Sequence, residues 1–308
     1  LGFNAKMFPE SDKFLKVMAE KLDFIVDVDL FMNMSANYAD IVLPACSSVE
    51  RSELKCYRGG YLVYTQPAIA PLYESKSDVD ILCELARVMD LDDDLLKGGY
   101  EACVEWMIDG CGLTLADLKT SSLPMKVPTA QWPVKPGKYL KEGFKTPTGK
   151  FEFYSTVIAG IDPKYGLDPL PSYVDSLADQ NDEETRTAYP FYFCTGARKP
   201  YAIHSRLHDT PWIRTLQPEP TCEISKQDAV HMDLKDGDTV TISSPYGSIK
   251  MKVKTTCKIK SGVVMALPGY TKANVNELLG RDHLDPYSGF PGYKGMRCNI
   301  TKCQEGKA

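Results

Sequence analysis

The hydrophobic pattern changes at Tyr189, and this change restricts the fold more than any other feature of the 308-residue sequence. Before Tyr189, apolar residues recur at helical spacing in some segments and form short continuous runs in others. After it, apolar and polar residues alternate with a period of two in short runs separated by turns. The sequence therefore predicts a partial α/β domain with a parallel sheet, followed by a β-barrel domain.

The first region, residues 1–119, predicts the latter part of an α/β domain. Ser11 could cap its first helix, whose apolar stripe includes Phe14, Leu15 and Met18. Helices that alternate with strands indicate a parallel sheet. This region contains too few predicted strands to form a complete sheet. The expected elements are helices over residues 11–22, from Ser77 or Asp78 to 89, and over 100–108, and strands over 24–28 and 39–44.

A connecting segment, residues 120–188, is expected to separate the two regions. Residues 120–150 are rich in Pro, Gly and Lys, and an acidic run lies near residues 179–184. Such a composition is typical of a domain boundary. Within the segment, the alternation over residues 150–154 predicts a short strand.

The last region, residues 189–308, predicts a compact barrel. Val240 and Ile242 alternate with polar residues, as do Ile249 and Met251, and a turn over residues 245–248 separates the two runs. We therefore expect a hairpin. A buried strand over 263–267 and one short helix over 227–232, capped by Ser225, complete a pattern that favours a barrel.

Charge and hydropathy exclude some classes of function. The chain has 36 basic and 41 acidic residues, a net charge of −5, whereas nucleic-acid-binding proteins usually carry a basic stripe. We therefore expect no nucleic-acid partner. A local basic pocket that binds a phosphate is compatible with this net charge. No apolar run reaches the ~18–20 residues of a membrane span, so we expect no span in this chain.

The ten cysteines show no metal-cluster spacing. No two are spaced as C-x-x-C, and no four form a ferredoxin-like run. We expect free, mostly buried thiols. The sequence predicts neither a catalytic nor a metal-ligating residue.

Two carboxylates lie beside the predicted strands. Asp29 follows the first strand, and ligands of open α/β sheets bind at that end of a strand. It could accept two parallel hydrogen bonds, which the N1 and N2 edge of guanine offers; a helix cap or a turn is the alternative. Asp40 opens the second strand, with Glu50 beyond it, and a structural aspartate is the alternative there.

A run of candidate ligand-binding residues opens the barrel region. Glycine allows a backbone to approach a ligand closely, and the arginine fork suits bidentate binding of phosphate. A solvated basic loop is the alternative. The candidates are Thr195, Gly196, Arg198, His204, Ser205 and Arg206.

A second candidate segment lies near the C-terminus. The amide of Asn276 can both donate and accept hydrogen bonds, and Lys294 follows it. An Asx turn or a cap is the alternative for Asn276. Each of these signals is weak when taken alone.

The order and spacing of the segments resemble the C-terminal half of the molybdopterin oxidoreductases, the dimethyl-sulfoxide-reductase superfamily. The resemblance covers nearly the whole chain. The family-like stretches are the Asp29 loop with residues 39–44, then residues 146–152, 195–198, 211–214, 218–220 with 224–229, 235–238, and the Asn276 segment.

This resemblance implies a bis(molybdopterin guanine dinucleotide) cofactor that holds molybdenum or tungsten. Asp29 matches the guanine-binding aspartate of the family, and Asn33 stands where a relative has threonine. The barrel is then similar to the six-stranded double-psi barrel, the molybdopterin-dinucleotide-binding domain that ends these enzymes. The implied cofactor-binding residues are Asp29, Asn33, Asp40, Thr195, Gly196, Arg198, His204, Ser205, Arg206, Asn276 and Lys294.

The chain departs from the family pattern in three places. Family members often carry an N-terminal Cys motif for a 4Fe–4S cluster, and a Cys, selenocysteine, Ser or Asp typically ligates the metal; neither feature has a matching position here. The Gly-Arg-x-Gln element of some relatives is replaced around Arg58 to Val63, with no Gln nearby. We therefore expect a fragment of a catalytic subunit, inactive alone. Its expected partners are the missing N-terminal part of that subunit, which could hold the 4Fe–4S cluster, and an iron–sulfur electron-transfer subunit.

Two other functions remain open from the sequence. A stand-alone molybdopterin-binding or cofactor-carrier module without catalysis is the first, because the segment that begins the metal chemistry is missing. An unrelated barrel with convergent motifs is the second. The resemblance does not name a substrate.

Overall fold

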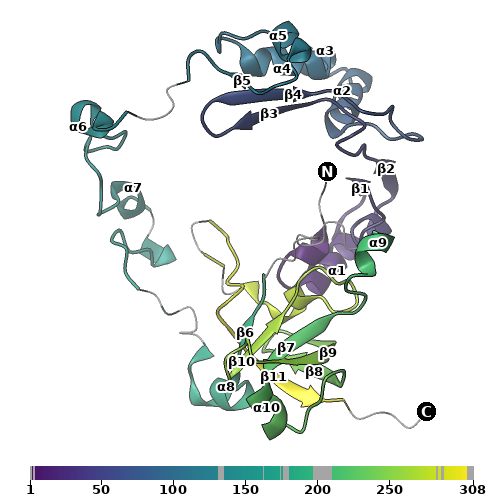
Figure 1. The fold of residues 1–308 in the computed structure, drawn as a ribbon, viewed down its shortest axis with the longest axis vertical. Helices are drawn as coiled ribbons and strands as arrows, with labels where there is room; N and C mark the ends of the chain where they lie inside the picture. Colours follow the sequence, from purple (N-terminus) through teal and green to yellow (C-terminus); the bar gives the residue numbers. More distant parts are fainter. Residues whose placement is uncertain are drawn as a thin grey trace. The chain divides into compact units, whose positions relative to one another are not determined.

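The computed structural model describes residues 2, 4–130, 135–161, 163–173, 175, 180–196, 210–281, 284–285 and 288–303 (Figure 1). Their contacts divide the chain into two compact units. Unit 1 comprises Leu1–Phe3, Phe24–Met32 and Ala39–Glu152, and unit 2 comprises Asn4–Asp23, Asn33–Tyr38 and Phe153–Ala308. This division differs from the boundaries expected near residues 119 and 188, because two N-terminal segments group with the barrel and the connecting segment is shared.

Unit 1 contains the expected parallel strand pair. β1 (Val26–Asp29) and β2 (Ile41–Pro44) run in parallel, with Asp29 opposite Pro44. The chain continues beyond β2 through a parallel bridge between Ala45 and Lys76. The prediction of parallel strands is confirmed, and Asp29 lies at their carboxyl edge.

A three-stranded antiparallel sheet in unit 1 was not expected from the sequence. Its strands are β3 (Glu53–Tyr57), β4 (Tyr61–Thr65) and β5 (Met125–Lys126), in the order β3-β4-β5. Gly59 and Gly60 adopt positive φ values of 98° and 74° in the β3–β4 turn, which favours glycine there. Leu62 and Tyr64 of β4 join the core of this unit.

Short helices complete unit 1. α2 (Asp78–Val88) begins after Ser77, whose hydroxyl accepts a 3.0 Å hydrogen bond from the amide of Asp80. Cys83 and Ala86 are the buried residues of this helix, whereas its larger apolar side chains Leu82 and Leu85 are exposed. The other helices are α3 (Asp94–Gly98), α4 (Tyr100–Ile108), α5 (Leu115–Thr120) and α6 (Lys138–Glu142), and α4 matches its predicted bounds.

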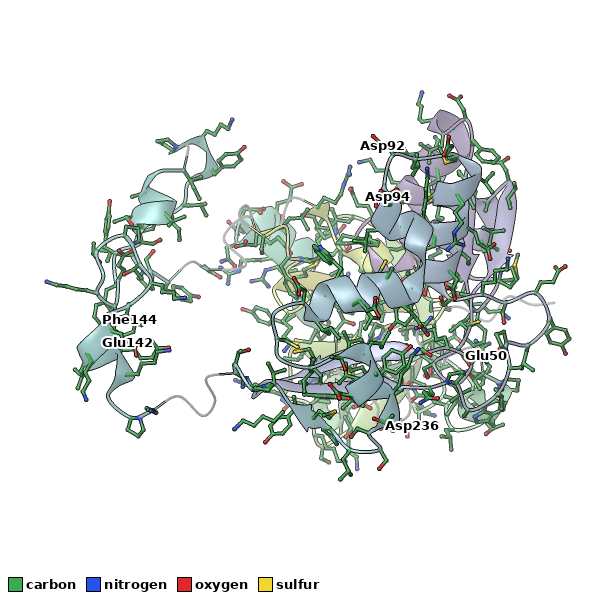
Figure 2. All side chains as sticks on the ribbon, turned by 90° about the horizontal axis from the view of Figure 1, so that it is seen from above. Glu50, Asp92, Asp94, Glu142, Phe144 and Asp236 are labelled. Carbon is green, nitrogen blue, oxygen red and sulfur yellow. The ribbon has the colours of Figure 1, made fainter. Side chains whose placement is uncertain are left out.

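The segment after α6 folds on itself instead of forming the strand predicted over residues 150–154. The rings of Tyr139 and Phe144 stack with centroids 4.7 Å apart, and Phe144 also meets Phe151 edge-on; Phe144 is labelled in Figure 2. Glu152 accepts hydrogen bonds from the amide and hydroxyl of Thr148. Because the segment makes these local contacts, residues 150–154 do not pair as a strand despite their alternating apolar and polar residues.

Unit 2 is built around a closed six-stranded barrel in the order β10-β6-β11-β8-β9-β7 (Figure 1). The pairs β10–β6 and β7–β9 are parallel, and the remaining pairs are antiparallel. The expected barrel, the β8–β9 hairpin and the Ser225 cap of α10 (Lys226–His231) are confirmed. The strands are β6 (Phe191–Cys194), β7 (Thr221–Ser225), β8 (Thr239–Ser243), β9 (Ser248–Thr256), β10 (Val263–Ala266) and β11 (Met296–Lys302).

N-terminal elements pack on the barrel side of the chain, in unit 2. Ser11 is the first residue of α1 (Ser11–Lys21) and not its cap, because its hydroxyl accepts a 2.7 Å hydrogen bond from the Asn274 amide. In the expected apolar stripe, Leu15 and Met18 are buried, whereas Phe14 is exposed. The remaining short elements of this unit are η1 (Ala5–Met7), η2 (Ala36–Tyr38), α7 (Thr156–Ala159), η3 (Pro163–Tyr165), α8 (Glu183–Ala188), α9 (Pro211–Arg214) and η5 (Val275–Leu278).

The ten cysteines are free thiols, and Cys46, Cys83, Cys222 and Cys298 are the buried ones. Fewer of the cysteines are therefore buried than expected. Within the described residues, no cluster of His, Cys, Asp and Glu is arranged to hold a metal ion. None of the described helices combines the length and the apolar character that crossing a membrane requires.

Candidate functional site

Asp29 ends β1 at the carboxyl edge of the parallel pair. One oxygen of its carboxylate accepts a 3.0 Å hydrogen bond from the amide of Phe31, which closes a turn. Because β2 runs in the same direction, the Pro44 end of β2 lies at this edge too. The sequence therefore placed Asp29 correctly at the edge where open α/β sheets bind ligands.

Asp27, two residues earlier, is a buried carboxyl group that the sequence analysis did not single out. Its side chain is 5% exposed, and its Oδ2 atom has no hydrogen-bond partner in the described part of the chain. Burial, and then repulsion by the Asp29 carboxylate, raise the pKa of Asp27. A buried polar atom without a partner is costly, so this end of β1 can accommodate a further hydrogen-bonding group.

Asn33 and Asp40 hold the local backbone. The amide oxygen of Asn33 accepts hydrogen bonds from the amides of Ser35 (2.7 Å) and Ala36 (3.1 Å), which caps η2. The carboxylate of Asp40 accepts a 2.7 Å hydrogen bond from the amide of Ile25. Since Asp40 precedes β2, it lies at the amino edge of the pair, and the structure does not bring it to Asp29.

Thr195 and Gly196 follow β6 at one end of the barrel. The amide of Thr195 donates a 3.2 Å hydrogen bond to the carbonyl of Tyr293, the residue that precedes Lys294. Thr195 is 3% exposed, and its hydroxyl has no partner among the described residues. Gly196 has a φ of 87°, and a Cβ built there would meet no described atom within 4 Å. The backbone is therefore accessible beside an unsatisfied buried hydroxyl.

Asn276 lies at the same end of the barrel. β6 and β8 both run antiparallel to β11, so their carboxyl ends lie at the same end of the barrel. Ser244, which follows β8, donates a 2.8 Å hydrogen bond to the carbonyl of Leu278 in η5, the short helix that contains Asn276. The Asn276 side chain is 1% exposed, and its amide donates to the carbonyl of Lys6 at 2.7 Å. That amide thus serves the fold, and its contact with a cofactor stays a prediction.

The candidates Arg198, His204, Ser205 and Arg206 lie outside the described residues. Their binding roles stay predictions. They follow Gly196 in the chain, and the described chain resumes at Thr210, whose hydroxyl is also buried without a partner in the described part.

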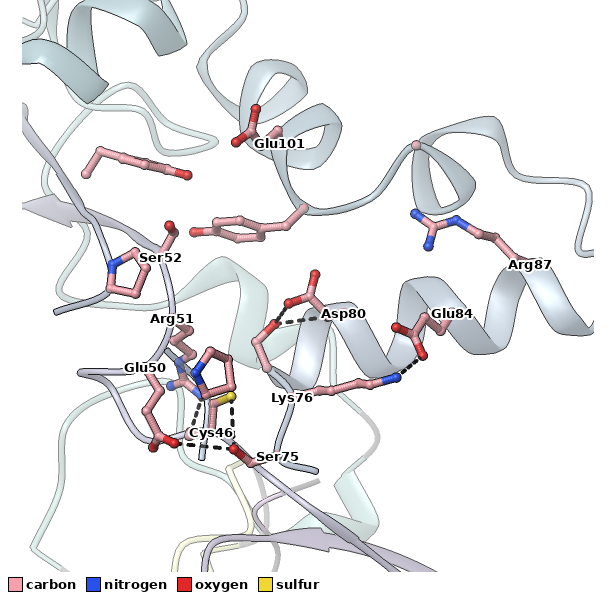
Figure 3. Close-up of a pocket in the computed structure, with 16 residues that line it drawn as sticks. Cys46, Glu50, Arg51, Ser52, Ser75, Lys76, Asp80, Glu84, Arg87 and Glu101 are labelled. Atoms are coloured by element: carbon pink, nitrogen blue, oxygen red, sulfur yellow. Dashed lines mark hydrogen bonds and ion pairs between the residues drawn. The ribbon is translucent and has the colours of Figure 1, made fainter. Parts of the chain in front are cut away.

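A polar cavity of about 660 Å³ lies within unit 1, beside α2 and α4 (Figure 3). Its charged side chains carry both signs, and several are already paired: Lys76 lies 2.6 Å from Glu84, and Arg51 binds Asp78 at 3.0 Å. Figure 3 shows the carboxylates and cations around the cavity interleaved. This arrangement favours structural ion pairs over a site for one charged ligand.

Glu50 anchors the loops beside this cavity. Its carboxylate accepts hydrogen bonds from the amides of Ser47 (2.8 Å) and Leu72 (2.7 Å) and from the hydroxyls of Ser47 and Ser75. These bonds lower the pKa of Glu50 to about 2. A carboxylate held so firmly in its ionised form is unsuited to general-base catalysis near neutral pH.

Two family models match the chain. The model described as molybdopterin oxidoreductase matches residues 5–88, which include Asp27 and Asp29. The model described as molydopterin dinucleotide binding domain matches residues 191–297, which include Thr195, Gly196 and Lys294. Asp29 and the pair Thr195 and Gly196 therefore fall in separate matched regions.

Curated relatives agree with these matches. Dopamine dehydroxylase of Eggerthella lenta is 24% identical over 91% of this chain and 36% of its own length. Dimethyl sulfoxide reductase of Escherichia coli (strain K12) is 26% identical over 80% of this chain and 32% of its own. Acetylene hydratase of Syntrophotalea acetylenica is 26% identical over 91% and 40%. The chain thus spans about a third to two fifths of the relatives it matches.

A solved structure agrees at the level of the fold. Acetylene hydratase from Pelobacter acetylenicus superposes with a TM-score of 0.82 at 24% identity, over 98% of this chain and 44% of that one. The likeness extends over both units and shows the fold alone.

Proposed function

This chain belongs to the molybdopterin oxidoreductases of the dimethyl-sulfoxide-reductase superfamily, and we propose that it is the cofactor-binding C-terminal part of a longer catalytic subunit. The proposed cofactor is bis(molybdopterin guanine dinucleotide) with molybdenum or tungsten. The six-stranded barrel is proposed to be the double-psi barrel of this family. An iron–sulfur subunit is the proposed electron-transfer partner.

One observation carries the proposal: a buried, unsatisfied hydroxyl lies beside an open backbone at the barrel end. The Thr195 hydroxyl has no described partner, and no described atom lies within 4 Å of where another residue would place a Cβ at position 196. A ligand rich in hydrogen-bonding groups would satisfy Thr195 and approach the Gly196 backbone closely. The side chains present therefore fit a polar, phosphate-bearing cofactor.

The roles of the chain's own residues follow from their chemistry. Asp29 would accept hydrogen bonds from the guanine edge, and Lys294 would offset phosphate charge. Arg198 and Arg206 would bind phosphate, while His204 and Ser205 would hydrogen-bond the pterin side. Once bound, the metal centre of the cofactor would supply the redox chemistry. None of the described residues is proposed as a nucleophile or a general base.

The first test is the intact mass of the polypeptide from its natural source, with metal and guanosine-nucleotide analysis on the same sample. A mass well above 34.3 kDa with molybdenum or tungsten is expected. A native mass near 34.3 kDa without metal would instead support a stand-alone binding module.

The second test is Asp29→Ala in the longer subunit. The variant is expected to fold and to retain less metal and nucleotide. Asp23→Ala, which changes an exposed aspartate before β1, is the matched control and should leave both contents unchanged. Equal contents in the two variants would remove Asp29 from the site.

A further inference from the structure

A second cavity, of about 470 Å³, lies on unit 2 against the outer face of β9. Two chain segments line its sides, one from Arg214 to Pro220 and the other from Tyr270 to Lys272. Lys250 and Lys252 face it from β9, because alternate residues of this strand point outward. The volume is in the range of small-molecule sites.

The cavity is strongly basic in a chain that is acidic overall. Arg214, Lys250, Lys252 and Lys272 line it, and Glu219 is the one acidic residue among its described lining residues. Glu219 pairs with Lys252 at 2.5 Å. Among the described residues, Lys250 and Lys272 have no acidic partner within ion-pair distance. Cations that converge from three segments create a local positive field despite the net charge of −5.

The walls of this cavity are held in place before any ligand binds. The hydroxyl of Tyr270 donates a 3.1 Å hydrogen bond to the carbonyl of Gln217, which ties the two lining segments together. Tyr270 is 7% exposed, and Pro218 and Pro220 restrict the backbone on both sides of Glu219. Binding would therefore cost little ordering of the backbone.

The cavity shares no lining residue with the proposed cofactor site. Around the closed barrel, β9 is separated from β6 by two strands in either direction. Thr195 and Gly196 follow β6, whereas Lys250 and Lys252 line the cavity from the outer face of β9.

We propose that this cavity binds a small molecule through a polyphosphate group. Lysine ammonium groups and an arginine fork suit phosphate oxygens, and the hydroxyls of Thr239 and Thr271 add neutral donors. Several converging cations match an anion with several charges better than a single carboxylate. The polyphosphate can come from a nucleoside triphosphate or from an inorganic chain.

Calorimetric titration of the 308-residue chain with inorganic tripolyphosphate and, separately, with adenosine triphosphate tests this proposal. Both are expected to bind, and equal affinity would identify the phosphates alone as the ligand, whereas tighter binding of the nucleotide would add a base contact. Lys250→Gln with Lys272→Gln is expected to weaken tripolyphosphate binding about tenfold or more.

Lys254→Gln is the matched control, because Lys254 is on the same face of β9 but does not line the cavity. It should change the affinity less than about twofold. Absence of tripolyphosphate binding to the unaltered chain, or equal weakening by the control, would overturn the proposal. Tighter binding of an aspartate-rich peptide than of tripolyphosphate would also overturn it, in favour of an acidic protein partner.

Discussion

The side-chain amide of Asn276 donates a 2.7 Å hydrogen bond to the main-chain carbonyl of Lys6, 270 residues earlier in the chain. The amide of Asn274 donates to the same carbonyl at 2.9 Å, and the Lys6 ammonium lies 2.8 Å from Glu277. Salt-bridging hydrogen bonds with Asp12 and Glu277 raise the pKa of Lys6 above its ordinary value against the opposing effect of burial. A segment from the start of the chain is thus built into the barrel unit.

Asn274→Ala is expected to destabilise unit 2. The side chain is 3% exposed and holds the Lys6 carbonyl, the Ser11 hydroxyl and the amide of Asn276, so its loss leaves buried groups unsatisfied. The expected loss is about 1–3 kcal/mol in urea unfolding. Asn37→Ala, at an exposed asparagine, should stay within about 0.5 kcal/mol of the unaltered chain. A similar effect of both changes would contradict this role.

Gly280→Ala is expected to disturb the contact between the β8–β9 turn and the segment after η5. A Cβ at residue 280 would lie 2.1 Å from the ring of Tyr246, so the ring or the backbone must move. Overpacking of this kind costs about 1–3 kcal/mol. Gly160→Ala, where a Cβ meets only ordinary contacts, is the control, and thermal unfolding of both variants provides the measurement. An unchanged melting temperature for Gly280→Ala would show that the ring moves freely.

Thr195→Val separates ligand binding from folding. Because the Thr195 hydroxyl is buried without a described partner, its removal should leave the chain without cofactor equally stable or stabilise it by up to about 1–3 kcal/mol. The same change should lower the metal and nucleotide content of the longer subunit. Thr241→Val, which removes a hydroxyl that contacts Cys303, should leave that content unchanged. Retained content in Thr195→Val would show that the hydroxyl does not contact the cofactor.

Glu50 is expected to make the stability of unit 1 depend on pH. Its folded-state pKa of about 2 is below the ordinary value of 4.5, so its contribution is complete above about pH 4.5 and is lost as the pH falls toward 2. Glu50→Gln should therefore be less stable than the unaltered chain at pH 7, and the difference should shrink between pH 4.5 and 2. Denaturant unfolding across this range measures it, with Glu74→Gln as an exposed control from a nearby loop. A difference that is constant with pH would contradict the expectation.

The elements that the sequence predicted well have strong local signals. The β8–β9 hairpin alternates regularly, α10 has a Ser cap, and α4 begins directly after Gly99. The β3–β4 hairpin was missed because Glu53–Tyr57 alternates only weakly. The third strand of this sheet was missed because β4 pairs with Met125 and Lys126, more than 60 residues along the chain. Long-range pairings of this kind depend on the tertiary fold and leave little local pattern.

The candidate site was also predicted only in part, because only some of its residues are marked by a local sequence pattern. Asp29 was placed at its edge by the strand that precedes it, and Gly196 by its position after a strand. The bond from Ile25 to Asp40 and that from Asn276 to Lys6 join residues that the sequence separates, so their structural roles were not visible. The unsatisfied carboxyl of Asp27 could be recognised only once its burial was known.

The chain passes between the two units after residues 3, 23, 32, 38 and 152. A genetic crossover near residue 153 would therefore produce a barrel without Lys6 and Ser11, to which Asn274 and Asn276 of the barrel unit donate hydrogen bonds. Neither unit is one uninterrupted stretch of sequence, so cutting the chain at a single position separates residues that belong to the same unit.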